Sequence, residues 1–182
     1  MSHDTFEPTL LCCCPLPARA RPRSAGATIA DGELATLREH ALRSYPNECC
    51  GVLAGTAGQR VEVRAVHPTD NHDAEQTATR YEIDPREILT FDRAAERAGQ
   101  QIIGFYHSHP DHSPVPSARD VELAWPGYIY LIVSVDEQRR TTVRAWRFEG
   151  EGADPLEVPI VSRGSALRKL GRIYRMLVNA WR

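Results

Sequence analysis

Two histidines separated by one residue and followed by an aspartate are the side chains best suited to chemistry. His107 and His109 end an apolar run, and the alternation of side chains along a strand directs both imidazoles to one face. A proline-containing segment then predicts a turn that returns the carboxylate of Asp120 toward the strand end. Catalytic zinc sites typically combine three nitrogen or oxygen ligands with an open position for water. The spacing therefore predicts one zinc ion per chain, held by His107, His109 and Asp120.

Each part of this group also has a purely structural explanation. A His-x-His triplet at the end of a strand is compatible with ordinary surface polarity. Ser117 and Asp120 stand in the Ser-x-x-Asp order of a helix capping box, in which Ser117 would be the N-cap. Either explanation would suffice alone, but the combination of both motifs across one turn favours the metal site.

Two other hydrolase chemistries share parts of this pattern. Residues 107–112 read His-x-His-x-Asp-His, as in metallo-β-lactamase-like hydrolases, but no histidine follows His112 to complete a second metal site. Cys49 or Cys50 would suit a cysteine hydrolase, in which a thiolate pairs with a histidine. Cys50 precedes Gly-Val-Leu, however, and is more simply explained as a small buried hydrophobic residue.

The spacing of these residues resembles the signature of the JAMM (MPN-plus) zinc metallopeptidases. That signature reads His-x-His, seven residues, Ser, two residues, Asp, and His107, His109, Ser117 and Asp120 fit it at each position. The resemblance implies that the two histidines and the aspartate bind zinc. It further implies that Ser117 donates a hydrogen bond to the oxyanion that develops during the reaction.

An upstream element adds a fourth type of functional residue to the resemblance. The family places a catalytic glutamate after its first helix and before a glycine-containing apolar strand, and residues 45–55 (YPNECCGVLAG) are similar to that element. Glu48 fills the position of the glutamate. The resemblance, which covers about residues 30–150, implies that Glu48 is the general base that moves a proton from the zinc-bound water to the leaving amine.

In its short length the chain resembles the minimal prokaryotic members of this family. Those members process small ubiquitin-like sulfur-carrier proteins by cutting next to a C-terminal Gly-Gly. The resemblance thus implies a peptidase or isopeptidase acting on such a carrier. A non-catalytic MPN scaffold remains an alternative, although such scaffolds usually lack some ligands and every position is filled here.

Composition limits the remaining function classes. With 182 residues, 42% hydrophobic and 25% charged, the chain has the composition of one globular domain. A net charge of -2 provides no general attraction for nucleic acid, and no apolar run approaches the length of a membrane span. The cysteines cluster at Cys12–Cys14 and Cys49–Cys50, unlike the spaced cysteines of a secreted disulfide framework, which predicts a reducing, cytoplasmic compartment.

Apolar periodicity and turn residues predict the elements that must position the site. The expected helices cover residues 31–44, 85–98 and a short stretch after Ser117, and the expected strands cover 50–54, 61–66, 101–107, 128–135, 141–148 and 156–161. This order predicts an α/β fold, a single MPN-type domain with a mixed, curved sheet packed with helices.

The two ends of the chain differ from this central domain. Residues 1–27 show neither helical nor strand periodicity and are predicted to be a flexible leader, which leaves 28–161 as the catalytic domain. Residues 162–182 predict a basic amphipathic helix. We expect its apolar stripe to dock on the sheet; the alternatives are a surface for a partner protein, for anionic lipid or for a second copy of the chain in a homodimer.

Overall fold

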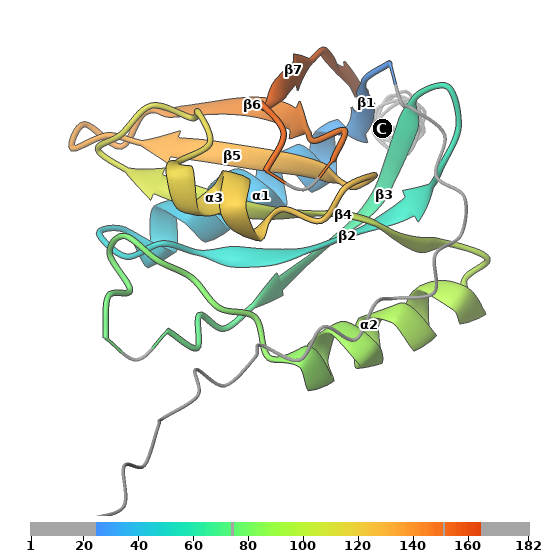
Figure 1. The fold of residues 1–182 in the computed structure, drawn as a ribbon, viewed down its shortest axis with the longest axis horizontal. Helices are drawn as coiled ribbons and strands as arrows, with labels where there is room; N and C mark the ends of the chain where they lie inside the picture. Colours follow the sequence, from blue (N-terminus) through green and yellow to red (C-terminus); the bar gives the residue numbers. More distant parts are fainter. Residues whose placement is uncertain (1–24, 74, 151, 165–182) are drawn as a thin grey trace, which may run out of the picture.

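The computed structural model describes residues 25–73, 75–150 and 152–164, which form three helices and eight strands (Figure 1). In chain order these are β1 Ala27–Ala30, α1 Asp31–Ser44, β2 Cys50–Thr56, β3 Val61–Thr69, α2 Pro85–Arg97, β4 Gln101–Pro110, α3 Ala118–Leu123, β5 Ile129–Val135, β6 Thr141–Arg147, β7 Leu156–Val158 and β8 Ile160–Arg163. The three predicted helices are confirmed. Several predicted strands extend by a few residues, because backbone pairing continues past the apolar run that revealed them.

All eight strands belong to one mixed sheet with the order β7-β6-β5-β4-β2-β3-β1-β8. The pairs β1–β3, β1–β8 and β4–β5 are parallel and the others antiparallel. β7 and β8 occupy opposite edges of the sheet, yet only Pro159 separates them along the chain. The sheet must therefore curl until its edges approach each other, which confirms the predicted α/β fold with a mixed, curved sheet.

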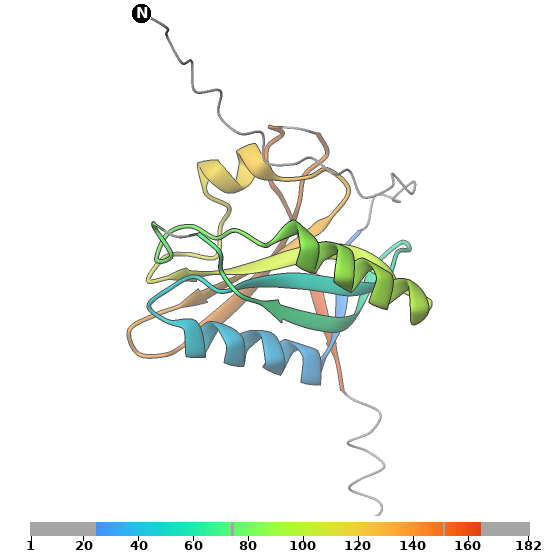
Figure 2. The same cartoon turned by 90° about the horizontal axis from the view of Figure 1, so that it is seen from below.

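The helices cover the two faces of this sheet (Figure 2). α1 places Leu37 and Ala41 in one buried cluster with β1, β3 and β5, whereas Ile88 and Phe91 of α2 and Val121 of α3 pack on a second cluster at the other face. Local sequence sets the ends of α2: the Asp84 side chain accepts a hydrogen bond from the Arg86 amide, and Gly99 follows the helix with φ +68°.

β4 is the strand that carries the two histidines, and it lies at the centre of the sheet. It pairs with β2 on one side and with β5 on the other, and every residue from 102 to 110 is buried. A Cβ atom on Gly104 would lie 1.9 Å from the Ile129 carbonyl oxygen, so only glycine permits this close approach of β4 and β5. The histidines therefore stand on a rigid support.

Three expectations at the ends of the domain were wrong. Residues 156–161 do not form one edge strand: they divide at Pro159, which has no amide hydrogen, into β7 and part of β8. Ser162 and Arg163, assigned from the sequence to the terminal helix, belong to β8, and Ala27, assigned to the leader, begins β1. The proposed leader up to residue 24 and the helix from residue 165 lie outside the described residues.

None of the helices in the described part of the chain has the length and apolar character needed to cross a membrane.

The tight crossing at Gly104 leads to a stability prediction. The substitution Gly104→Ala should lower the free energy of unfolding by about 1–3 kcal/mol or more, because the added methyl group overlaps the β5 backbone. Gly32→Ala is the matched control, since nothing lies within 4 Å of a Cβ at this position in α1, and it should leave stability equal or higher. Urea unfolding of both variants tests this, and equal stability of G104A and wild type would contradict it.

Candidate metal centre

The two histidines of β4 place their ring nitrogens face to face. His107 and His109 point to the same side of the strand, and their Nε2 atoms lie 3.0 Å apart. Both side chains are buried, with 1% and 8% of their surface exposed. The alternation expected from the sequence thus produces a pair of imidazoles inside the protein, at one end of the central strand.

Asp120 reaches the pair from the first turn of α3. Its Oδ1 lies 3.2 Å from Nε2 of His107, and its Oδ2 lies 3.5 Å from Nε2 of His109. Ser117 fixes this carboxylate through the capping box: its amide donates to Asp120 Oδ2 at 2.7 Å, and its hydroxyl oxygen accepts from the Asp120 amide at 3.1 Å. The capping box and the cluster of candidate ligands therefore coexist.

Neighbouring groups orient the two imidazole rings. Nδ1 of His109 lies 2.9 Å from the Ser113 carbonyl oxygen, to which it donates as an N–H, and this leaves the lone pair of Nε2 free. The His107 ring stacks on Tyr81, with ring centroids 4.6 Å apart. Among the described residues, Nδ1 of His107 is buried and has no hydrogen-bond partner.

The charges in this group suit a cation. Burial lowers the pKa of His107, although its hydrogen bond to Asp120 opposes the shift. Burial would raise the pKa of Asp120, but hydrogen bonds from His107 and His109 outweigh burial and hold that pKa far below its usual range. Burial also lowers the pKa of His109, but hydrogen bonds to Asp120 and the Ser113 carbonyl outweigh it and leave the pKa raised. The carboxylate is thus charged and burial favours the neutral form of His107, whereas the raised pKa of His109 depends on its contact with the negative charge of Asp120, which a cation would neutralise.

These donors fit a divalent metal ion. One ligand atom from each of His107, His109 and Asp120 lies within 4.8 Å of the other two. Two facing imidazole nitrogens share at most one proton, whereas a cation would satisfy both nitrogens and the partly buried carboxylate together. Two nitrogens and one oxygen also match the ligand preferences of zinc.

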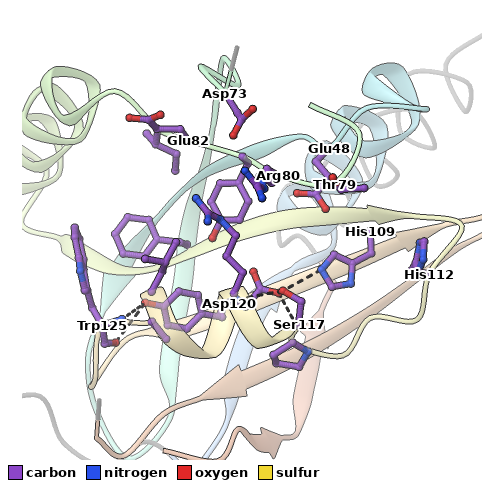
Figure 3. Close-up of a pocket in the computed structure, with 18 of the residues that line it drawn as sticks. Glu48, Asp73, Thr79, Arg80, Glu82, His109, His112, Ser117, Asp120 and Trp125 are labelled. Atoms are coloured by element: carbon purple, nitrogen blue, oxygen red, sulfur yellow. Dashed lines mark hydrogen bonds and ion pairs between the residues drawn. The ribbon is translucent and has the colours of Figure 1, made fainter. Parts of the chain in front are cut away.

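Glu48 lies just before β2 and beside this group, in the same cleft as His109 and Asp120 (Figure 3). The next residue, Cys49, is tied to the residue between the histidines: its amide donates to Ser108 Oγ at 2.8 Å, and its carbonyl accepts from the Ser108 amide at 3.0 Å. Glu48 is 7% exposed, and burial raises its pKa to about 8, with the charge of His109 acting in the opposite direction.

A cleft of about 590 Å³ extends from this group between α3 and the segment before α2. In Figure 3 it runs from His109 and His112 toward Trp125. Several side chains that line it are apolar and more than one third exposed, namely Leu89, Val115, Leu123 and Trp125. The cleft thus joins a polar, charged end to an open apolar surface.

The other chemistries considered from the sequence find no support in this geometry. Cys49 and Cys50 are 2% and 0% exposed, and burial raises the pKa of their thiols to about 11 and about 12, which disfavours a thiolate nucleophile. His112 lies apart from the ligand group: its Nδ1 is 2.8 Å from the Pro110 carbonyl oxygen. The His-x-His-x-Asp-His string therefore does not converge on one point.

Sequence reasoning missed three residues that shape the site. Tyr81 stacks on His107, Ser108 ties β4 to the residue after Glu48, and Asn71 hydrogen-bonds to the Glu48 carbonyl oxygen at 3.2 Å. The sequence did contain a signal for Ser108: the alternation of side chains along a strand turns it to the face opposite the histidines, where it can contact the neighbouring chain. Tyr81 and Asn71 lie in a polar connection without periodicity, where only the folded chain reveals their contacts.

Comparisons with known proteins find relatives that cover most of the described domain. The desampylase of Haloferax volcanii is 48% identical over 124 residues, which cover 68% of this chain and 86% of that protein. The CysO-cysteine peptidase of Mycobacterium tuberculosis is 38% identical over 109 residues, 59% of this chain and 73% of that protein. A solution structure of a protein from Desulfitobacterium hafniense aligns with a TM-score of 0.68 at 30% identity, covering 76% of this chain and 94% of that one.

The family comparison covers the whole candidate site. The family described as prokaryotic homologs of the JAB domain matches residues 32–149, which include Glu48, both histidines and Asp120. This match confirms the resemblance on which the sequence prediction rested. Because it spans more than half of the chain, the protein belongs to the family of prokaryotic homologs of the JAB domain.

Proposed function

We propose that the protein is a zinc-dependent peptidase or isopeptidase that hydrolyses the amide bond next to the C-terminal Gly-Gly of a small ubiquitin-like sulfur-carrier protein. The observation that carries the proposal is the convergence of the buried His107 and His109 with the partly buried Asp120, with Glu48 in the same cleft. The names of the two relatives, a desampylase and a CysO-cysteine peptidase, support the reaction class.

In this proposal His107, His109 and Asp120 hold one zinc ion. Zinc bound by three such ligands lowers the pKa of a water molecule and polarises a substrate carbonyl. The protein contributes the arrangement of the donors. The Ser113 carbonyl fixes the tautomer of His109, and the Ser117 amide fixes the rotamer of Asp120, so neither ligand has to reorient when it binds.

Glu48 is proposed to move the proton. Its carboxylate would accept a proton from water on one side of the scissile bond and donate it to the leaving amine on the other. Burial keeps its pKa near neutrality, at about 8, so the carboxyl group can both accept and release a proton. A nearby cation favours the charged form, which is the form that a general base requires.

Ser117 is proposed to donate to the developing oxyanion, with one geometric condition. In the structure its hydroxyl donates to Oδ2 of Asp120 at 2.7 Å. The hydroxyl must therefore rotate toward the substrate during the reaction, while the Ser117 amide continues to hold Asp120.

The cleft supports a substrate with a thin, extended end. It is open enough to admit a peptide segment, and the candidate metal ligands lie at its polar end. Two glycines allow a backbone to approach closely, since no side chain intervenes. We propose that the apolar part of the cleft contacts the carrier before its Gly-Gly.

The free thiols of Cys49 and Cys50 suit a reducing compartment, so we expect the enzyme to act in the cytoplasm.

The first prediction concerns the metal. Purified protein should contain about one zinc per chain, and His107→Ala or Asp120→Ala should remove most of it, because each takes away one of three donors. His112→Ala is the matched control and should retain zinc, since His112 lies outside the ligand group. Elemental analysis measures the content. A wild-type protein without zinc after zinc supplementation would favour the non-catalytic scaffold.

The second prediction concerns Glu48. Glu48→Gln should keep its zinc but lose hydrolysis by a factor of about 10² to 10⁴, the usual contribution of a general acid–base group. Glu39→Gln, on the exposed side of α1, makes the same chemical change away from the cleft and should retain full activity. Full turnover by the E48Q enzyme would remove Glu48 from the mechanism.

The third prediction concerns the substrate. A ubiquitin-like carrier extended by one residue beyond Gly-Gly should lose that residue when incubated with the zinc-loaded enzyme, and a chelator should prevent the loss. Replacing the carrier's Gly-Gly with Ala-Ala should abolish cleavage, because side chains obstruct close approach. Mass spectrometry of the carrier reads both results. Cleavage that persists in chelator would contradict the metal-dependent reaction.

A further inference from the structure

The side chain of Asn71 uses its whole hydrogen-bonding capacity in the connection between β3 and α2. Its Nδ2 donates to the carbonyl oxygens of Glu48 and Arg80, at 3.2 and 2.8 Å. Its Oδ1 accepts from the amides of Asp73 and Glu82, at 3.0 and 3.1 Å. A side-chain amide offers two donors and two acceptor positions, and all four are used here.

Two of these contacts enclose Tyr81 along the chain. The Arg80 carbonyl precedes Tyr81 and the Glu82 amide follows it, so one amide group holds the backbone on both sides of this residue. The ring of Tyr81 stacks on His107 at 4.6 Å between centroids, with 21° between the ring planes. Asn71 therefore fixes the aromatic ring that packs against one of the proposed metal ligands.

The other contact reaches the proposed general base. Asn71 binds the Glu48 carbonyl, and the Glu48 amide donates to the Thr77 carbonyl at 2.7 Å. Both backbone groups of Glu48 are thus held by the same connection. On its far side, Glu48 is followed by Cys49, whose backbone is held by Ser108 of β4. The backbone that carries the Glu48 side chain is thus held on both sides, by Ser108 of β4 and by Asn71.

We infer that Asn71 is a positioning residue for hydrolysis: it sets Glu48 and Tyr81 relative to the zinc ligands without touching the substrate. The inference rests on the proposed function for its catalytic consequence. Its structural part stands alone, because the four hydrogen bonds of Asn71 exist whatever reaction the site performs. Replacing a residue that orients functional side chains through hydrogen bonds typically changes activity by about 10- to 100-fold.

The most informative substitution is Asn71→Asp. Aspartate keeps the shape and both acceptor positions, but its carboxylate oxygen would face the carbonyl oxygens of Glu48 and Arg80 and repel them. Asn47→Asp is the matched control: it adds the same charge next to Glu48, but within the described part of the chain the Asn47 side chain makes one hydrogen bond, in which its Oδ1 accepts from the Thr77 hydroxyl at 3.1 Å and which aspartate can keep. Asn71→Ala removes the contacts without adding charge.

Kinetics with a carrier substrate test the catalytic part. N71D should lower kcat by about 10- to 100-fold while zinc content is unchanged, and N47D should stay close to wild type. In an E48Q background, N71D should cause little further loss, because residues that act through one another are not additive. Two results would overturn the role of Asn71 through Glu48. One is a double variant whose loss of activity equals the product of the N71D and E48Q losses, and the other is equal activity of N71D and N47D.

Hydrogen exchange tests the structural part in the metal-free protein, independently of any activity. In wild type the Asp73 and Glu82 amides should exchange slowly for a surface connection, since a side chain holds them. N71A should accelerate exchange at both amides and at Glu48, whereas N47D should not. Fast exchange of these amides in wild type would overturn the inference without requiring a folded variant. If the wild type cleaves no carrier, the proposed function fails while the exchange result still decides the role of Asn71.

Discussion

The structure depends on two imidazole nitrogens held 3.0 Å apart beside a partly buried carboxylate. Buried polar groups in such an arrangement are costly unless each is satisfied, and here the surrounding protein satisfies most of them. β4 supplies both histidines, and its pairing with β2 and β5 fixes the strand on both sides. The resulting centre is rigid, and a cation would complete its hydrogen-bonding and charge balance.

The curled sheet and the site are linked through the strand register. Cys50, the first residue of β2, pairs with His107 of β4. Glu48, two residues before Cys50, is therefore brought to the end of β4 that carries the histidines. Ser108 strengthens this alignment through both backbone groups of Cys49. Because a shift by one residue would turn every side chain to the other face, this register decides whether Glu48 and the histidines share a cleft.

Much of the site could be predicted because it depends on local rules. The strand period of two places His107 and His109 together, and the capping box explains how Ser117 holds Asp120. Glu48 required the family resemblance, since a carboxylate after a helix carries no signal of its own. The contacts of Asn71 and Tyr81 could not be predicted, because they join residues through a connection without periodicity. Sheet closure by β1 and β8 was missed for a similar reason: β1 has four residues, too few to show a pattern, and its parallel partners are distant in sequence. Pro159 was the available signal that the strand predicted for 156–161 must divide.

The central claim is that His107, His109 and Asp120 bind zinc, and X-ray absorption spectroscopy at the zinc edge tests it most directly. The account predicts a four-coordinate zinc with two imidazole nitrogens and two oxygen ligands, and loss of most of the bound zinc, and of this spectrum with it, in the His107→Ala protein. A spectrum dominated by zinc–sulfur scattering would contradict the account, because it would assign the metal to cysteine thiolates instead of this cluster.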